Sequence, residues 1–285
     1  HAHLLNMPFL IAVFFVGFNL LSEDSHPLLG GGGGGSSPPL SWDRGVFPSL
    51  REGRGVFISA LLPILLVGTL GVISSWDYPT GVIFLLLIAA FKTYRNFRQR
   101  RQKLKTQIRP LGYIIGVLIP GSLLLYAPFY VSFSRSQMGL GLIGNATTRL
   151  SDFLTFFGFF CFGILSFLIV QAWRIRKSES PWGVFMALLL FVAGIYTLML
   201  HVFSMNYATL LFVLSLLLFS SYIFAKQKEW LFAPLVENTF IWMCLGYACL
   251  ILAGCEVVFV RDFLQGGEWK RMNTIFKFYI PAWFL

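Results

Sequence analysis

The residues of this chain that can do chemistry stand in short polar segments, and one segment sets an acid between two aromatic rings. Residues 74–80 read SSWDYPT. Aromatic rings stack on sugar faces, and a carboxylate between them accepts a hydroxyl proton or holds a metal ion. Alternatively, Asp77 caps the following helix while Trp76 and Tyr78 lie at a membrane interface. Both interpretations stay open, with Asp77 as the first candidate for a catalytic acid.

The densest group of charges lies between residues 255 and 279. We expect Glu256 just over one turn inside the outer end of one helix and Lys277 about one turn inside the start of the next. An antiparallel pair of helices would bring these charges to similar depth. Ionisable groups within a membrane cost about 2.5–3.5 kcal/mol each on insertion scales, so they are usually paired or functional. A structural ion pair and two site residues fit the pattern equally well.

More charged residues occupy the connection between those two helices. Arginine holds phosphate through two parallel hydrogen bonds, which makes Arg261 and Arg271, with Lys270, candidate ligands for a phosphate or diphosphate. Asp262 is a further candidate acid, and Asn273 follows the basic pair. Alternatively, this connection contacts lipid headgroups at the membrane surface.

Two histidines and one arginine complete the candidates. His1 and His3 share one face of an extended segment and could hold a metal there, whereas on a helix they point to opposite sides. The alternative is a pair of polar residues at a helix mouth. Arg149 adds positive charge to the polar segments.

The apolar runs between these segments predict a membrane scaffold. A helix that rises about 1.5 Å per residue needs about 20 residues to cross a hydrocarbon core of roughly 30 Å. Backbone groups in lipid must be satisfied within helices or closed barrels, and runs this continuous favour helices. We predict an all-α, polytopic transmembrane bundle of eight to nine helices in a single domain, residues 1–285. Seven runs lack Asp, Glu, Lys and Arg, namely 4–21, 56–73, 111–130, 153–173, 182–201, 208–225 and 239–255; a shorter run covers 78–91, and a last one begins at 274.

Composition and charge agree with a membrane protein. Charged residues make up 12% of the chain, against about 25% in a soluble domain, and hydrophobic residues make up 56%. The net charge of +10 comes from basic residues in the connections, which indicates topology signals and lipid contacts and gives no sign of nucleic-acid binding. The four cysteines fall inside apolar runs without metal or disulfide spacing, so we expect packing thiols.

Charge distribution predicts which connections face the cytoplasm. Residues 92–109 carry eight basic side chains and no acid, which is typical of a cytoplasmic loop. Counting the runs outward places residues 22–55, with their glycine run, on the same side as a flexible linker. Residues 74–80 and 261–273 then lie outside the cytoplasm. The chain is therefore predicted to be a multi-pass protein of the cell membrane whose candidate site residues gather at the extracytoplasmic face.

Four motifs, in order along the chain, resemble the YYY family of polytopic membrane proteins. They are HAHLLNMPF (1–9), WDYPT (76–80), YAPFY (126–130) with TRL (148–150), and RMNTIFKFY (271–279). That family is grouped with the GT-C superfamily of multi-spanning glycosyltransferases, which take sugars from polyprenyl-linked donors. The resemblance runs through the whole chain, and the last motif is its most specific element.

The chain departs from that family in two places. The family's first motif has a Gly-Asp pair before the two histidines, a point upstream of the first residue given, and Ile280 and Pro281 stand where the family has Tyr and Gln. Because the chain also ends inside an apolar run, we expect it to be a piece of a longer protein.

The resemblance implies a glycosyltransferase with a polyprenyl-phosphate sugar donor, with or without a divalent metal. In such a reaction a carboxylate deprotonates the acceptor hydroxyl, while Arg or Lys stabilises the departing phosphate. The alternatives are a lipid or sugar transporter, which the uncharged apolar runs disfavour, and a non-catalytic scaffold. The candidate catalytic residues are Asp77, Glu256 and Asp262, and the candidate substrate-binding residues are His1, His3, Trp76, Tyr78, Arg149, Arg261, Arg271, Asn273 and Lys277.

Overall fold

The structure, a computed structural model, divides the chain into two compact units, and each is described here by itself. Unit 1 comprises His1–Phe133 and Leu231–Met243, and unit 2 comprises Ser134–Trp230 and Cys244–Leu285. The residues that the structure describes are 2–22, 55–99, 108–133, 139–144, 147–175, 193, 207–226, 236–261 and 271–285.

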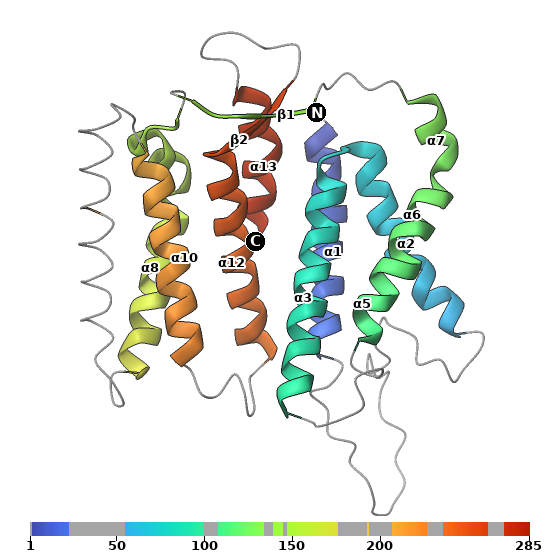
Figure 1. Ribbon diagram of the computed structural model, residues 1–285, viewed down its shortest axis with the longest axis horizontal. Coiled ribbons are helices and arrows are strands. Elements are labelled where there is room, and N and C mark those ends of the chain that lie inside the picture. Colours follow the sequence, from blue (N-terminus) through green and yellow to red (C-terminus); the bar gives the residue numbers. More distant parts are fainter. Residues whose placement is uncertain are drawn as a thin grey trace, which may run out of the picture. The chain divides into compact units, whose positions relative to one another are not determined.

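The predicted all-α membrane helix bundle is confirmed, and helices occupy the predicted apolar runs wherever those runs are described (Figure 1). Three helical segments are long and apolar enough to cross a membrane: Leu150–Arg174, Ala208–Lys226 and Asn238–Cys255. Shorter apolar helices cover Leu5–Leu21, Leu61–Ile73 and Pro110–Leu125. The run predicted at 182–201 lies outside the described residues, apart from Ala193.

Unit 1 is built on three mutually packed helices, α1 (Ala2–Ser22), α2 (Gly55–Ile73) and α3 (Asp77–Gln99). Phe84 of α3 is fully buried, and its ring meets Phe14 of α1 edge to face with ring centres 4.7 Å apart. The first part of α12 (Val236–Cys255) belongs to the same unit and adds Phe240, whose ring lies 6.1 Å from Phe84. Apolar and aromatic packing therefore fixes the positions of α1 and α3, which carry the polar residues discussed below.

Helix α3 is longer than the apolar run that predicted it. The sequence suggested a loop from Lys92, whereas the helix continues to Gln99. Lys92 is buried and its Nζ donates a 2.7 Å hydrogen bond to the carbonyl of Leu20 in the last turn of α1, where helix carbonyls lack intrahelical partners. Arg95 is buried as well. The first basic residues after the apolar run thus belong to the folded helix.

The run predicted as one helix over 111–130 is broken into consecutive pieces. They are α5 (Arg109–Tyr113), the π-helical turn η1 (Ile114–Leu118), α6 (Ile119–Leu125) and α7 (Ala127–Ser132). Each of the three α-helical pieces has a proline in its first two positions. Proline lacks an N–H and clashes with the carbonyl four residues earlier, so it starts a helix well and interrupts one from inside.

Unit 2 contains α8 (Leu150–Ile175), α10 (Ala208–Lys226), the later part of α12 and α13 (Met272–Phe284). Helices α8 and α10 pack together, and the ring of Phe157 in α8 meets Tyr279 of α13 at 5.0 Å. A two-stranded antiparallel ribbon, which the sequence did not predict, pairs β1 (Gly139–Leu142) with β2 (Val258–Arg261).

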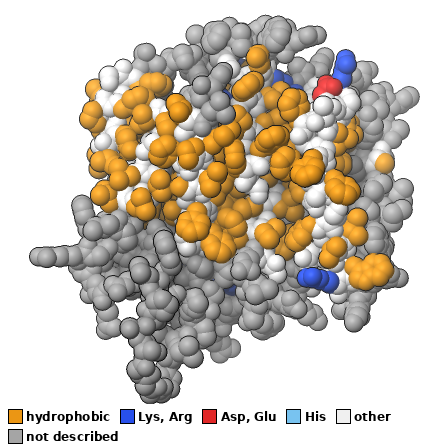
Figure 2. Space-filling model, turned by 180° about the vertical axis from the view of Figure 1, so that it is seen from behind, with side chains coloured by type: hydrophobic (Ala, Val, Ile, Leu, Met, Phe, Trp, Pro, Cys, Tyr) orange, Lys and Arg blue, Asp and Glu red, His pale blue; other side chains and the backbone are white. Residues whose placement is uncertain are grey.

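Hydrophobic side chains cover most of the described surface on the face seen in Figure 2. Many are large and exposed, such as Phe156, Phe159 and Phe162 on one side of α8. Continuous apolar surface of this kind is stable in lipid and unfavourable in water, which agrees with the membrane class.

Candidate functional site

The first candidate site surrounds the Asp77 carboxylate in unit 1. Helix α2 ends at Ile73, and a tight turn follows in which the Asp77 amide donates to the carbonyl of Ser74 at 3.0 Å. Asp77 is the first residue of α3, where backbone amides and the helix dipole favour a negative charge. Its side chain is 3% exposed and accepts a 2.6 Å hydrogen bond from Asn6 Nδ2 of α1. The structure thus places a buried acid between two helices.

Asn6 is the residue of this site that the sequence reasoning missed. It is 1% exposed, and its Nδ2 also lies 3.5 Å from the carbonyl oxygen of Leu70 near the end of α2. A single amide within an otherwise apolar helix was the available signal, because polar side chains in membrane helices usually hydrogen-bond to another helix.

Of the two aromatic neighbours of Asp77, Tyr78 makes a contact through its side chain and Trp76 accepts a hydrogen bond through its backbone. The Tyr78 hydroxyl lies 3.0 Å from Ser122 Oγ of α6, so Tyr78 faces α6 while Asp77 faces α1. The carbonyl of Trp76, which is partly exposed in the turn, accepts a 2.9 Å hydrogen bond from the Thr80 hydroxyl. Within unit 1, Tyr78 joins α3 to α6 through this contact.

Two tyrosines of the YAPFY motif pack against glycines of α2. The Tyr126 hydroxyl lies 2.7 Å from Thr69 Oγ1, and a Cβ at Gly68 would overlap the Tyr126 ring. A Cβ at Gly71 would overlap the Tyr130 hydroxyl in the same way. These glycines are needed for close approach, because any larger residue would displace the rings.

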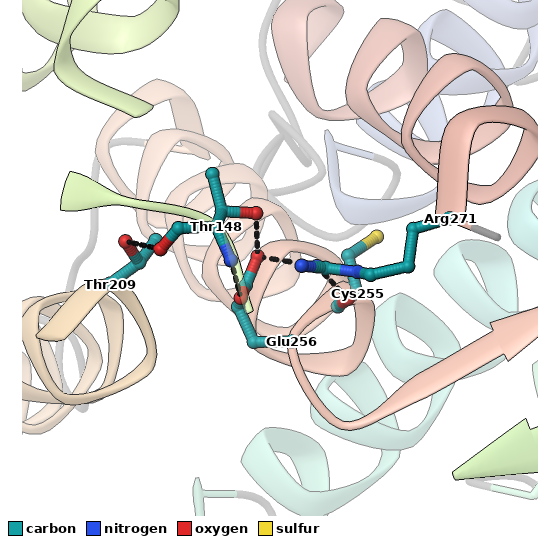
Figure 3. A network of polar contacts seen from close by, with 5 residues as sticks. All are labelled: Thr148, Thr209, Cys255, Glu256 and Arg271. Carbon is teal, nitrogen blue, oxygen red and sulfur yellow. Dashed lines mark hydrogen bonds and ion pairs between the residues drawn. The ribbon is translucent and has the colours of Figure 1, made fainter. Parts of the chain in front are cut away.

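The second candidate site surrounds Glu256 in unit 2 (Figure 3). This residue is 1% exposed and lies in the turn that follows α12. Its Oε1 accepts from the Arg271 guanidinium at 2.7 Å and from the Thr148 hydroxyl at 2.6 Å, while Oε2 accepts from the Thr148 amide at 3.0 Å. Both carboxylate oxygens and the negative charge are therefore satisfied inside the protein.

The same network joins four segments of unit 2. Arg271, which is 4% exposed and precedes α13, also donates to the carbonyl of Cys255 at the end of α12. The Thr209 hydroxyl of α10 donates to the carbonyl of Thr148 at 2.8 Å. The arrangement acts as a structural clamp between the segment before α8 and the ends of α10, α12 and α13.

The structure corrects two details of the sequence interpretation here. Glu256 was predicted inside a helix, but α12 ends at Cys255. The ion pair that the sequence left open between Glu256 and Lys277 exists with a different cation, Arg271. Lys277 lies in the second turn of α13 and is partly exposed. The sequence analysis paired Glu256 with Lys277 from their expected depth in the membrane. In the structure, the turn after α12 instead brings Glu256 to Arg271, the residue before α13.

The remaining candidates are distributed over both units. Arg149 and Arg261 are exposed in unit 2, and Asn273 is partly exposed in the first turn of α13. His3 lies in the first turn of α1, but its side chain, like His1, Asp262 and Lys270, is outside what the structure describes. Among the described residues, no group of three or more His, Cys, Asp or Glu side chains is arranged to hold a metal ion.

Long apolar helices, buried polar contacts between them and exposed aromatic surface together define a polytopic membrane protein. The whole chain, residues 1–285, matches DUF2298, a family described as uncharacterized membrane protein, and the chain belongs to this family. Lipid is accordingly its environment. No curated protein and no solved structure matches the chain.

Proposed function

We propose that the protein is a membrane glycosyltransferase that moves a sugar from a polyprenyl-phosphate donor to an acceptor hydroxyl, at the extracytoplasmic face. The observation that supports this best is the buried Asp77 carboxylate, which is held by the Asn6 amide at the start of α3. Glu256 is a poorer candidate for a base because its charge is already matched by Arg271. The motif resemblance supplies the reaction class.

In the proposed reaction, an acceptor oxygen forms a bond to the anomeric carbon as the bond from that carbon to the phosphate oxygen breaks. Asp77 takes the proton of the acceptor hydroxyl, and the polyprenyl phosphate leaves as an anion. A cation near the phosphate would stabilise the charge that develops there.

The test is a transfer assay with the full chain in phosphatidylcholine vesicles, supplied with radiolabelled undecaprenyl-phosphate hexose and a panel of hydroxyl acceptors. Loss of a general base lowers turnover by about 10²–10⁴-fold, and we expect this for Asp77→Asn. Asp152→Asn is the matched control, because Asp152 is an exposed residue in the first turn of α8. Equal turnover by both variants would remove Asp77 from the site, and no transfer by the intact chain would refute the proposed reaction.

A lipid or sugar carrier is the second candidate, and one observation favours it. The π-helical turn Ile114–Leu118, followed by Pro120, interrupts the regular α-helical hydrogen bonding of this apolar run, and transporters often use discontinuous helices. Movement of labelled donor lipid between leaflets without transfer to any acceptor would support the carrier.

A further inference from the structure

The two-stranded ribbon of unit 2 lies where membrane-spanning helices begin and end. The spanning segment Asn238–Cys255 is followed by β2 (Val258–Arg261), and β1 (Gly139–Leu142) precedes the spanning segment Leu150–Arg174. In Figure 1, β1 runs across the end of α12. Spanning segments end where the hydrocarbon core meets the lipid headgroups, so the ribbon lies at the level of the bilayer surface.

Contacts on both edges of β2 hold the ribbon in this place. On one edge, the strand pairing with β1 is extended by the Ile143 amide, which donates to the carbonyl of Val257 at 2.9 Å. On the other edge, the Val260 amide donates to the Thr274 hydroxyl of α13 at 2.9 Å. Phe259 and Val260 are buried. Among the described elements, β1 is therefore the outer strand and β2 the inner one.

The two faces of the outer strand differ in character. Successive side chains of a strand alternate between its faces, so Leu140 and Leu142 share one face, and they are 57% and 76% exposed. On the other face, a Cβ at Gly141 would lie 2.6 Å from the Phe259 ring and 3.0 Å from Nε of the exposed Arg261. The ribbon therefore carries leucines on one face and an arginine on the opposite face.

A two-faced ribbon at this level fits the boundary between lipid headgroups and acyl chains. Exposed leucines gain free energy when they leave water for an apolar environment. An arginine at the same level keeps its guanidinium among the lipid phosphates. A partner protein is a poorer fit, because two leucines offer far less surface than the roughly 800 Å² that each partner of a stable complex buries.

We propose that the ribbon of β1 and β2 binds the lipid surface, with Leu140 and Leu142 inserted at the acyl-chain boundary and Arg261 among the headgroup phosphates. Amphipathic helices in this layer bury their apolar face about 5–10 Å into the boundary, and we expect a similar depth for the leucines. The ribbon would then fix the connection between α12 and α13 at the bilayer surface. This inference is independent of the proposed sugar transfer.

The test measures depth by electron paramagnetic resonance, with the full chain in phosphatidylcholine vesicles and a nitroxide attached to Leu142→Cys. Relaxation by oxygen, which concentrates in lipid, is compared with relaxation by a nickel chelate, which stays in water. We expect oxygen to dominate, at a depth of about 5–10 Å. The described native cysteines are buried, and the unsubstituted chain treated with the same reagent gives the background signal. If this variant does not fold, Leu140→Cys tests the same face.

Two further labelled positions serve as controls. Phe159 is 83% exposed and lies about 13 Å along α8 from Leu150, so a label at Phe159→Cys should report a greater depth. Arg261→Cys carries the label on the opposite face of the ribbon, where the nickel chelate should dominate.

Three results would overturn the proposal. Nickel contact at the leucines as strong as at Arg261 would place the ribbon in water. Weak contact with both reagents at the leucines would show that protein covers them, as in an assembly of two copies. Oxygen contact at Arg261 equal to that at Leu142 would show that the ribbon does not have one lipid-facing and one headgroup-facing side.

Discussion

Each of the two units holds a buried carboxylate, and the hydrogen-bond donors around the two differ. Glu256 of unit 2 meets a guanidinium, a hydroxyl and a backbone amide, so its charge and both oxygens are balanced within the chain. Asp77 of unit 1 accepts a 2.6 Å hydrogen bond from the side-chain amide of Asn6 in α1. Burial is the same in both places. The comparison teaches that burial alone does not assign the role of an acid, because two carboxylates of similar burial are held here by different donors.

Removing Arg271, the cation that pairs with Glu256 in unit 2, should have the largest effect on stability. Arg271→Ala leaves the Glu256 charge buried without its partner, which typically lowers the free energy of unfolding by about 3–5 kcal/mol. Denaturant titration of the purified protein in detergent micelles measures this. Arg261→Ala is the control, since Arg261 is an exposed arginine of the same unit and should change little. Equal losses in both variants would contradict the clamp.

A smaller loss in the free energy of unfolding is expected when one hydrogen-bond donor to Glu256 is removed. Thr148→Val deletes the hydroxyl that lies 2.6 Å from Oε1, and a hydrogen bond to a charged group contributes about 1.5–3 kcal/mol. Thr155→Val serves for comparison, because Thr155 is exposed and its hydroxyl donates to the carbonyl of Ser151 in its own helix. The same titration measures both variants, and a Thr148 variant as stable as the Thr155 variant would argue against a charge-assisted contact.

In unit 1, the stability of the protein should depend on the absence of a side chain at Gly68. Gly68→Ala places a methyl group in the volume of the Tyr126 ring, and overpacking of this kind costs about 1–3 kcal/mol. Gly112→Ala in the same unit meets nothing within 4 Å and gains helix propensity, so it should be neutral or stabilising. In thermal unfolding, the midpoint temperature should therefore fall for Gly68→Ala and should stay the same or rise for Gly112→Ala.

The smallest effect is expected at the periphery of the Glu256 network. Thr209→Val removes a neutral hydrogen bond to the Thr148 carbonyl, a change of about 1 kcal/mol. Measured with Thr148→Val in a double-mutant cycle, it reports whether α10 is coupled to the carboxylate. Strict additivity of the two losses would place Thr209 outside the network.

Much of the fold was predictable because membrane helices are selected by length and apolarity. The helices begin and end near the predicted runs in α1, α2, α8, α10 and α12. The end of α3 was missed because Lys92 pairs with the Leu20 carbonyl of another helix, a tertiary contact that local charge does not reveal. The break at Ile114–Leu118 was hidden within an apolar run, and β1 and β2, with four residues each, are too short to give a periodic signal.

The charged residues of the candidate sites could be predicted from the sequence, whereas most of the residues that they contact could not. Asp77, Glu256 and Arg271 were predicted from their charge and their position in the polar stretches between apolar runs. The contacts of Asp77 with Asn6 and of Glu256 with Thr148 join positions that are 71 and 108 residues apart, and no spacing rule connects them. Asn6 is a single amide in an apolar run, and nothing near it in the sequence indicates a partner.

The most direct test of the two-carboxylate account measures unfolding and sugar transfer for Asp77→Asn and Glu256→Gln together. Glu256→Gln should lower the free energy of unfolding by about 3 kcal/mol or more, because the Arg271 charge is left without its counter-ion. Asp77→Asn keeps an oxygen that can accept from Asn6, so it should unfold much like the intact protein while losing transfer. The account is contradicted if Asp77→Asn is the less stable of the two or if it transfers sugar at the rate of the intact chain.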